Sequence, residues 1–227
     1  MTRTLLGICA GIGLVIALFF FPRLSAGEER VASDPKSAGE VSRPPGSDAV
    51  RRAAIASHET EAAALAGLMP AGVKSVLAVT KTLKHGDFVW DDQGIPQGPV
   101  HVWVDLRRQT ISVFRAGHEI GSSIIVYGAG EKPTPLGSFE VLSKHRHYRS
   151  RRYDAEMPYS LFITRDGIAL HSSVLQPRHA THGCVGLPDE FARRLFELAD
   201  LGAVVDITRS DPEIIERFVK RSQSSVR

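Results

Sequence analysis

The chain has 227 residues, of which 43% are hydrophobic and 23% are charged, so it is long enough to bury the core of one globular domain. Its formal net charge is only +3, and this small basic excess lacks the clustered Lys and Arg with interleaved aromatics that binds nucleic acid. We therefore expect no nucleic-acid partner. The charge is compatible with a neighbouring anionic envelope polymer or membrane surface.

The N-terminus has the pattern of an export signal. Arg3 precedes an unbroken apolar run from Leu5 to Phe21. A positive start before an apolar core of this length is typical of a signal sequence, and the run just reaches the length at which a helix spans a bilayer. We predict that residues 1–25 are a signal peptide or signal anchor, and we favour an uncleaved inner-membrane anchor over cleavage near Ala26. The rest of the chain is then expected in the periplasm or cell envelope.

Composition divides the remaining chain into three segments. Residues 26–95 begin with a polar stretch rich in Glu, Ser, Pro and Gly, followed by an Ala-rich stretch from Asp48 to Leu68. We interpret this segment as a linker and a peripheral helical stalk. Residues 96–209 carry strand patterns and are expected to form the globular body. Residues 210–227 are expected to form a C-terminal amphipathic helix and tail.

Short strands are predicted throughout the globular body. Apolar and polar residues alternate from His101 to Leu106 and again from Thr110 to Phe114, which is the period-2 pattern of a β-hairpin. Gly, Pro and Asp residues separate the strands that follow. These further strands are expected at Ile120–Tyr127, Gly137–Leu142, Leu161–Thr164, Gly167–His171 and Ala203–Ile207.

One helix is predicted within the body, after Cys184. Pro188 suits a first helical turn, Asp189 and Glu190 suit the positive end of the helix dipole, and Gly202 suits the exit. So many short strands with a single helix indicate a mainly β domain. We predict a β-sandwich or barrel-like fold with one packed helix after the cysteine.

The cysteines give the first indication of chemistry. Of the two, Cys9 lies inside the N-terminal apolar run, so Cys184 has no disulfide partner in the exported body. A lone thiol there is either buried filler or a nucleophile. The nucleophile is the thiolate, and His171 and His182 are near enough in sequence to serve as its base. The helix predicted after Cys184 would favour the thiolate through its dipole.

A zinc site is the competing interpretation of the same stretch. His171, His179, His182 and Cys184 are residue types that bind zinc, but their spacing matches no usual pairing and no second cysteine is available. We therefore expect neither a metal nor an organic cofactor.

Two sequence blocks resemble the L,D-transpeptidase family with a YkuD-type catalytic domain. Residues 181–185, Thr-His-Gly-Cys-Val, are similar to the signature of that family, in which a histidine and a short loop precede Ser/Thr-His-Gly-Cys. Gly128-Ala129-Gly130 followed by residues 133–139 is similar to its Gly, then Thr-Pro-x-Gly-x-Phe, segment. Met157-Pro158-Tyr159 also fits, so the resemblance covers residues 101–208.

The resemblance implies a role for each residue of the motif. Cys184 is the nucleophile that attacks an acyl carbonyl, and His171 is its general base and acid. The backbone of Ser172 or Ser173 orients that base, Gly183 contributes an oxyanion-binding amide, and His182 shapes the site. The candidate substrate contacts are Tyr153, Met157, Arg149 and Thr181.

The resemblance also implies the substrate, a peptidoglycan stem peptide. The thioester formed on release of the terminal D-alanine is resolved by an amine of a neighbouring stem, a D-amino acid or water. Many family members carry Arg or Asn where this chain has Gly186, which leaves the choice of acceptor open. The rival interpretations are a carboxypeptidase or envelope-protein attachment enzyme with the same site, and a peptidoglycan-binding module whose site has decayed.

Overall fold

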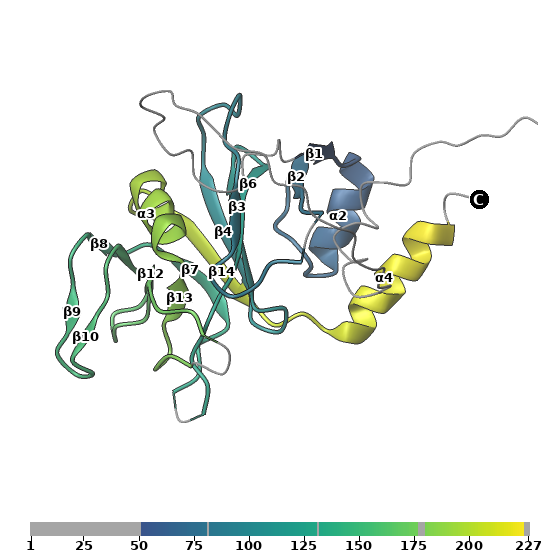
Figure 1. Ribbon diagram of the computed structural model, residues 1–227. Helices are drawn as coiled ribbons and strands as arrows, with labels where there is room; N and C mark the ends of the chain where they lie inside the picture. The colour runs from purple at the N-terminus through teal and green to yellow at the C-terminus, as the bar shows by residue number, and fades with distance from the viewer. Residues whose placement is uncertain (1–50, 81, 131, 177–179, 225–227) are drawn as a thin grey trace, which may run out of the picture.

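The computed structural model describes residues 51–80, 82–130, 132–176 and 180–224 (Figure 1). The predicted signal peptide or anchor at residues 1–25 and the first part of the predicted linker lie outside these residues. Within the described residues, no helix is long and apolar enough to cross a membrane.

The described residues fold into short strands and three helices. The strands are β1 (Arg51–Ala54), β2 (Ser75–Ala78), β3 (Phe88–Trp90), β4 (Val100–Asp105), β5 (Thr110–Arg115), β6 (His118–Ile124), β7 (Gly137–Glu140), β8 (Ser143–His145), β9 (Arg149–Ser150), β10 (Ala155–Glu156), β11 (Ser160–Phe162), β12 (Ala169–Ser172), β13 (Val185–Leu187) and β14 (Val204–Thr208). The helices are α2 (Ser57–Leu65), α3 (Asp189–Leu198) and α4 (Pro212–Ser224), the last of which projects from the body in Figure 1.

The large sheet has the strand order β1-β2-β6-β5-β4-β14-β7, with β3 paired to β6. Its centre is the meander β4-β5-β6, which forms because apolar residues alternate along each strand and one set faces the core. The β5–β6 turn places Ala116 at φ 51° and Gly117 at φ 84°, the double positive φ that a two-residue hairpin turn requires. The predicted hairpin is the preceding pair, β4–β5, which is antiparallel from Val100 opposite Arg115 to Asp105 opposite Thr110.

A smaller sheet and helix α3 cover one face of the large sheet. The smaller sheet has the order β13-β12-β11-β8. The apolar side of α3 is buried with side chains of both sheets in one core, where the ring of Phe191 meets the edges of Phe88 at 5.8 Å and Trp90 at 5.3 Å between centroids. The predicted mainly β, sandwich or barrel-like class with one packed helix after Cys184 is confirmed.

Residues 125–128 join the two sheets where β6 ends. Val126 forms an antiparallel bridge with Gly186 of β13, and Gly128 forms a parallel bridge with Thr181. The chain therefore passes from one sheet to the other without a free edge at this corner. This junction brings the first motif block, around Gly128, against the second, around Cys184.

The segment predicted as linker and stalk differs from that expectation after residue 50. It contains the expected helix, α2, but it also supplies β1, β2 and β3 to the large sheet. Strands of three or four residues in an Ala-rich context leave too short an alternation to be recognised from sequence.

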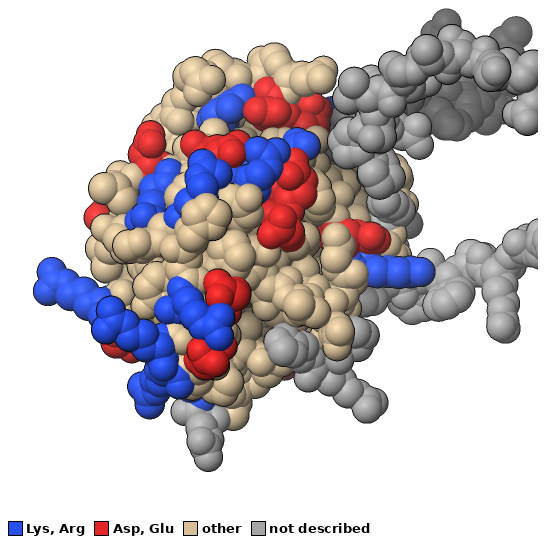
Figure 2. Space-filling view, turned by 60° about the vertical axis from the view of Figure 1, so that its left-hand side comes forward, with Lys and Arg blue, Asp and Glu red and all other residues tan. Residues whose placement is uncertain are grey.

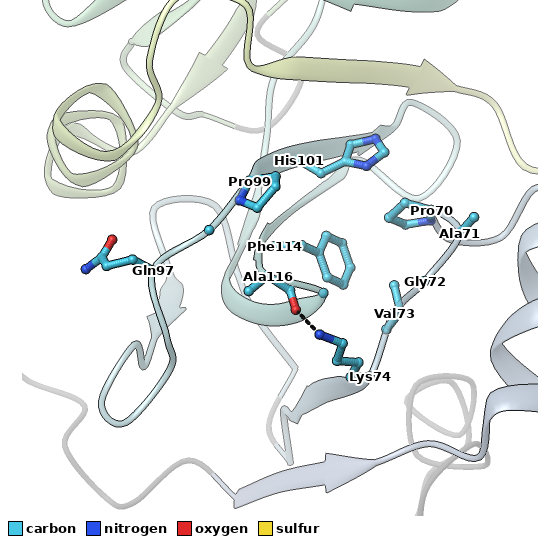
Figure 3. A pocket seen from close by; sticks show the side chains of 12 residues that line it. Pro70, Ala71, Gly72, Val73, Lys74, Gln97, Pro99, His101, Phe114 and Ala116 are labelled. Atoms are coloured by element: carbon cyan, nitrogen blue, oxygen red, sulfur yellow. Dashed lines mark hydrogen bonds between the residues drawn. The ribbon is translucent and has the colours of Figure 1, made fainter.

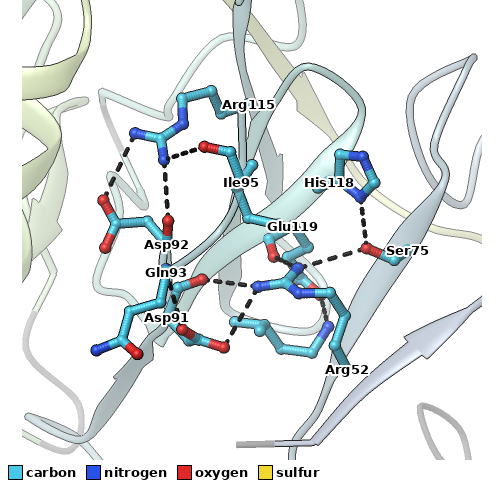
Figure 4. A network of polar contacts seen from close by, with 10 residues as sticks. Arg52, Ser75, Asp91, Asp92, Gln93, Ile95, Arg115, His118 and Glu119 are labelled. Atoms are coloured by element: carbon cyan, nitrogen blue, oxygen red, sulfur yellow. Dashed lines mark hydrogen bonds and ion pairs between the residues drawn. The ribbon is translucent and has the colours of Figure 1, made fainter. Parts of the chain in front are cut away.

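Polar contacts hold this segment against the body (Figure 4). The guanidinium of Arg52 donates to the backbone carbonyls of Glu119 and Asp91. In return, the Leu77 N–H donates to the Glu119 carboxylate at 2.8 Å. A buried carboxylate that accepts a backbone hydrogen bond from β2 ties that strand to β6 and makes residues 51–90 part of the folded unit.

Candidate active site

The parallel pair β12–β13 positions the two residues predicted to react. His171 lies directly opposite Gly186 in the register, and Cys184 is two residues before Gly186. Opposed residues of a parallel pair point to one face, as do residues two apart along a strand. Cys184, one residue before the start of β13, is therefore diagonal to His171 in this register. Gly186 has no side chain to stand between them.

The backbone fixes the tautomer of His171. Its ring is buried, with 8% exposed, and Nδ1 lies 2.6 Å from the Ser172 carbonyl oxygen. Because a carbonyl can only accept, Nδ1 carries the proton and Nε2 is left as the basic nitrogen. Burial lowers the pKa of His171, and the hydrogen bond to Ser172 opposes that shift only partly. The ring is therefore neutral near pH 7 and able to take a proton.

Ser172 is itself held by two hydrogen bonds. Its N–H donates to the Pro158 carbonyl at 2.9 Å, and its hydroxyl donates to the Asp189 carboxylate at 2.7 Å. Asp189 is the first residue of α3, so the start of the helix and the strand that carries the base are locked together. The carbonyl that orients His171 cannot turn away without breaking these bonds.

The thiol of Cys184 rests against backbone. Its Sγ lies 3.7 Å from the Gly167 carbonyl oxygen. Burial raises the pKa of the thiol, and the negative charge of Asp166 raises it further. A hydrogen bond from the Ala169 backbone and the positive charge of Lys132 lower the same pKa but do not outweigh burial.

These shifts differ from the expectation that the helix dipole would favour a thiolate. Helix α3 begins only at Asp189, and Asp189 and Glu190 occupy its first turn, so the positive end of the helix already has acidic neighbours. A raised thiol pKa beside a lowered imidazole pKa keeps both partners neutral at rest.

We expect this neutral pair to appear in the pH dependence of alkylation. In a Cys9→Ser background, where Cys184 is the only thiol, the iodoacetamide rate should rise through an apparent pKa above the ordinary thiol value, because only the thiolate reacts. Stopped alkylation followed by intact mass, from pH 6 to 11, gives the profile. A plateau already reached by pH 6 would contradict a neutral resting pair.

Thr134 joins the two motif blocks. Its buried hydroxyl accepts a hydrogen bond from the Gly128 N–H at 2.8 Å and donates to the Gly183 carbonyl at 2.9 Å. In a planar trans peptide the N–H points opposite to the C=O. Because Thr134 holds the Gly183 carbonyl, the N–H of Cys184 in the same peptide group points in the opposite direction, away from Thr134. This fixes the backbone amide that is a candidate for stabilising an oxyanion.

The Thr134→Val variant is expected to lower kcat by about 10- to 100-fold, because a small displacement of a positioned donor has effects of that size. The change keeps the shape of the side chain but removes both hydrogen bonds, with a stability cost of about 1–3 kcal/mol. Thr60→Val is the matched control, since Thr60 is also buried and its hydroxyl donates to the Ser57 carbonyl in α2. Steady-state kinetics and thermal unfolding of both variants check the prediction. Equal kcat values in the two variants would contradict it.

Two glycines of the motifs are required by close packing. A Cβ on Gly128 would lie 2.4 Å from the Gly183 Cα, which no real contact allows. Gly183 adopts φ +103°, a conformation that favours glycine, and a Cβ there would meet the Ile168 side chain at 2.6 Å. The loop before Cys184 therefore depends on both residues being glycine.

Gly186 is also enclosed by its neighbours. A Cβ at this position would lie 2.6 Å from Val126 Cγ2 and 2.8 Å from Ser173 Cβ. The Arg or Asn that many family members carry here would not fit this backbone. The departure from the family pattern is therefore matched by local packing in this chain.

The remaining predicted site residues fall into two groups. Tyr153 lies at the site, because its ring stacks on His182 with centroids 4.1 Å apart at 14°, and the Thr181 hydroxyl donates to the Cys184 carbonyl. Met157 is buried, and Arg149 forms ion pairs within its own β9–β10 hairpin. Of these four candidate contacts, Tyr153 and Thr181 therefore interact with residues of the loop around Cys184.

Two residues beside the site were missed by sequence reasoning, Thr134 and Lys132. Thr134 lies inside the quoted Thr-Pro-x-Gly block, but its partner Gly183 is 49 positions away, and only the folded corner brings them together. Lys132 precedes that block, and its Cγ lies 3.6 Å from where a Cβ on Gly183 would be. A lysine beside a motif is a signal that sequence reasoning could have used.

One surface pocket is separate from the predicted site residues. A pocket of about 400 Å³ is lined by residues 70–74, 97–99, 101, 114, 116 and 117, and contains none of the predicted site residues (Figure 3). Figure 2 shows acidic and basic side chains interleaved over one face, with basic side chains projecting at its lower left. Among the described residues, no three His, Cys, Asp or Glu side chains gather as a metal site requires; His179 lies outside them.

Comparisons with known proteins show which family model and which solved structures the domain resembles. Residues 99–207 match the YkuD family model, the L,D-transpeptidase catalytic domain. The chain is similar to the solved L,D-transpeptidase of Stackebrandtia nassauensis, with 26% identity over 52% of this chain and 58% of that chain and a TM-score of 0.47. It is also similar to one from Mycobacterium tuberculosis H37Rv, with 28% identity over 48% of this chain and 57% of that chain and a TM-score of 0.45. No curated protein matches it significantly.

The matched residues 99–207 take in strands β4–β13, helix α3 and most of β14, which together make a mainly β domain. The model that matches residues 99–207 is the one for the L,D-transpeptidase catalytic domain of YkuD type, the family that the motifs of this chain resemble. The chain spans less than two thirds of the length of the two solved chains described above.

Proposed function

We propose that this protein is a peptidoglycan L,D-transpeptidase that transfers an acyl group from a tetrapeptide stem through Cys184 to an amine acceptor. The observation that supports the proposal is the β12–β13 register, in which His171 lies opposite Gly186, two residues after Cys184. The family match over residues 99–207 supports the same reaction class. The resemblance to L,D-transpeptidases implies that the acyl donor is a peptidoglycan stem peptide.

In the acylation step, Nε2 of His171 takes the thiol proton as Sγ of Cys184 attacks the carbonyl carbon of the third stem residue. The negative oxygen that forms is stabilised by the Cys184 amide, which Thr134 orients through Gly183. As the C–N bond breaks, His171 returns its proton to the amine of the departing D-alanine. A thioester remains on Cys184.

The second step reverses these proton movements. An acceptor amine attacks the thioester carbonyl, the C–N bond forms and the C–S bond breaks. His171 takes the proton of the attacking amine and returns one to the sulfur. Throughout both steps the Ser172 carbonyl keeps Nδ1 protonated, so that Nε2 alone exchanges protons.

We place the reaction in the periplasm or cell envelope, with the chain anchored in the inner membrane by residues 1–25. The apolar run from Leu5 to Phe21 supports this location. The partner is then the peptidoglycan stem peptide on the outer side of that membrane.

Incubation of the full chain with a tetrapeptide-stem muropeptide tests the proposal. We expect loss of the terminal D-alanine together with a crosslinked dimer, both detected by mass spectrometry. Loss of the terminal D-alanine without crosslinking would favour the hypothesis of a carboxypeptidase or an envelope-protein attachment enzyme. Binding of the muropeptide without any turnover would favour a decayed peptidoglycan-binding module.

A further inference from the structure

Lys132 carries a positive charge beside the reacting sulfur that none of the steps above uses. Its side chain runs along the catalytic loop, where Cγ lies 3.6 Å from the position of a Cβ on Gly183, the residue before Cys184. Its ammonium lies 5.7 Å from the centroid of the Tyr153 ring, which stacks on His182. Lys132 therefore borders the site from the side of the first motif block.

The backbone of Lys132 is held firmly in that place. Its carbonyl oxygen lies 2.5 Å from where a Cβ on Gly128 would be, and the Thr134 N–H two residues on donates to the Gly128 carbonyl at 3.2 Å. These contacts belong to the packed corner that also holds Gly183. The Lys132 side chain therefore starts from a fixed backbone position beside Gly128 and Gly183.

The positive charge of the Lys132 ammonium is available to bind an anionic ligand. Among the described residues, no carboxylate lies within ion-pairing distance of Lys132, although Asp166 is near enough for the two charges to act on each other. Its positive charge also reaches Cys184, where it favours the thiolate. A half-buried cation near the nucleophile, with no ion pair to any residue that the structure describes, can bind a substrate anion.

The donor proposed above has an anion at the required place. In a tetrapeptide stem, the residue after the scissile bond is the last one, so its free carboxylate lies within about 4 Å of the carbon that Cys184 attacks. We propose that Lys132 binds this terminal carboxylate and thereby selects donors that end one residue after the scissile bond. This inference rests on the proposed function for the identity of the donor.

The first test does not depend on the proposed function. In the Cys9→Ser full chain, the rates of Cys184 alkylation by iodoacetate and by iodoacetamide are compared at one pH. Both reagents need the same thiolate, so their ratio reports attraction of a carboxylate to the thiol and not a change in thiol pKa. We expect the iodoacetate/iodoacetamide ratio to fall about 5-fold or more in Lys132→Met, the size of a partly screened charge contact. An unchanged ratio would overturn the proposal.

Arg152→Met is the matched control, because Arg152 lies 5.6 Å from the centroid of the same Tyr153 ring. Its alkylation ratio should stay at the wild-type value. A fall in this variant equal to that in Lys132→Met would assign the effect to general positive charge around the ring, and would overturn the role of Lys132.

The second test uses donors that end in D-alanine carboxylate or D-alanine carboxamide. Wild type should use the carboxylate donor about 10- to 100-fold better in kcat/KM, mainly through KM, and Lys132→Met should lose this preference. Equal slowing of both donors by the substitution would overturn the proposal. If wild type turned over neither donor, the proposed function would be wrong. A lowered alkylation ratio in Lys132→Met would even then support Lys132 as a carboxylate-binding residue.

Discussion

Replacement of Cys184 with alanine is expected to abolish acyl transfer, with at least about a 10³-fold loss of kcat. The thiol is the atom that becomes the thioester, so no neighbouring group can replace it. Cys184 is partly exposed and its sulfur contacts the Gly167 carbonyl, so the substitution should change folding stability little. Turnover of the tetrapeptide donor, measured beside thermal unfolding, checks both expectations.

The control for this variant is Ser57→Ala, an exposed residue at the start of α2 on the far side of the large sheet. It should keep wild-type turnover. If Cys184→Ala retained donor turnover while remaining folded, the thioester route would be wrong, whatever the family match suggests.

The His171→Gln substitution is expected to lower kcat by about 10²- to 10⁴-fold, the range in which general acid–base catalysis contributes. Glutamine approximates the size of the ring and can keep a hydrogen bond to the Ser172 carbonyl, but it cannot carry a proton between sulfur and amine. Because the resting thiol is neutral, loss of the base leaves only the small thiolate fraction of Cys184 to react.

This predicts a change in pH dependence as well as in rate. The residual activity of His171→Gln should rise with pH, because deprotonation of the thiol by solvent takes over from the missing base. His58→Gln on the exposed side of α2 is the matched control and should behave as wild type. A variant that lost activity with an unchanged pH profile would contradict the role of His171 as base.

Much of the fold could be predicted because its signals are local. The period-2 alternation from His101 to Leu106 and from Thr110 to Phe114 fixed the hairpin β4–β5, and the acidic start and apolar stripe fixed α3. The predicted strand Ile120–Tyr127 was longer than β6, which ends at Ile124. Residues 125–128 continue as an extended chain, but their partners are in the other sheet, a fact that alternation cannot reveal.

The candidate site was predicted less completely than the fold. Cys184 and His171 could be proposed from motif spacing because their roles follow from residue type. The contact of Thr134 with Gly183 could not, since it depends on a corner between two sheets. Nor could the raised thiol pKa, because burial of Cys184 is set by residues distant in sequence and outweighs the expected effect of the helix.

The segment before residue 91 shows the same limit. An Ala-rich composition indicated a helix, and α2 is present, yet the neighbouring β1 and β2 are held to the large sheet by Arg52 and Glu119 (Figure 4). Charged residues in a polar stretch are normally solvated. Their burial here depends on partners that the sequence alone does not identify.

Intact mass spectrometry of the full chain after exposure to a carbapenem tests the central claim most directly. The β-lactam carbonyl mimics the donor amide, so Cys184 should open the ring and retain the whole inhibitor as a thioester. We predict a mass increase of one carbapenem on wild type and Cys9→Ser, and no increase on Cys184→Ala. Folded wild-type protein without an adduct, or an adduct that persists in Cys184→Ala, would contradict Cys184 as the acyl-accepting nucleophile.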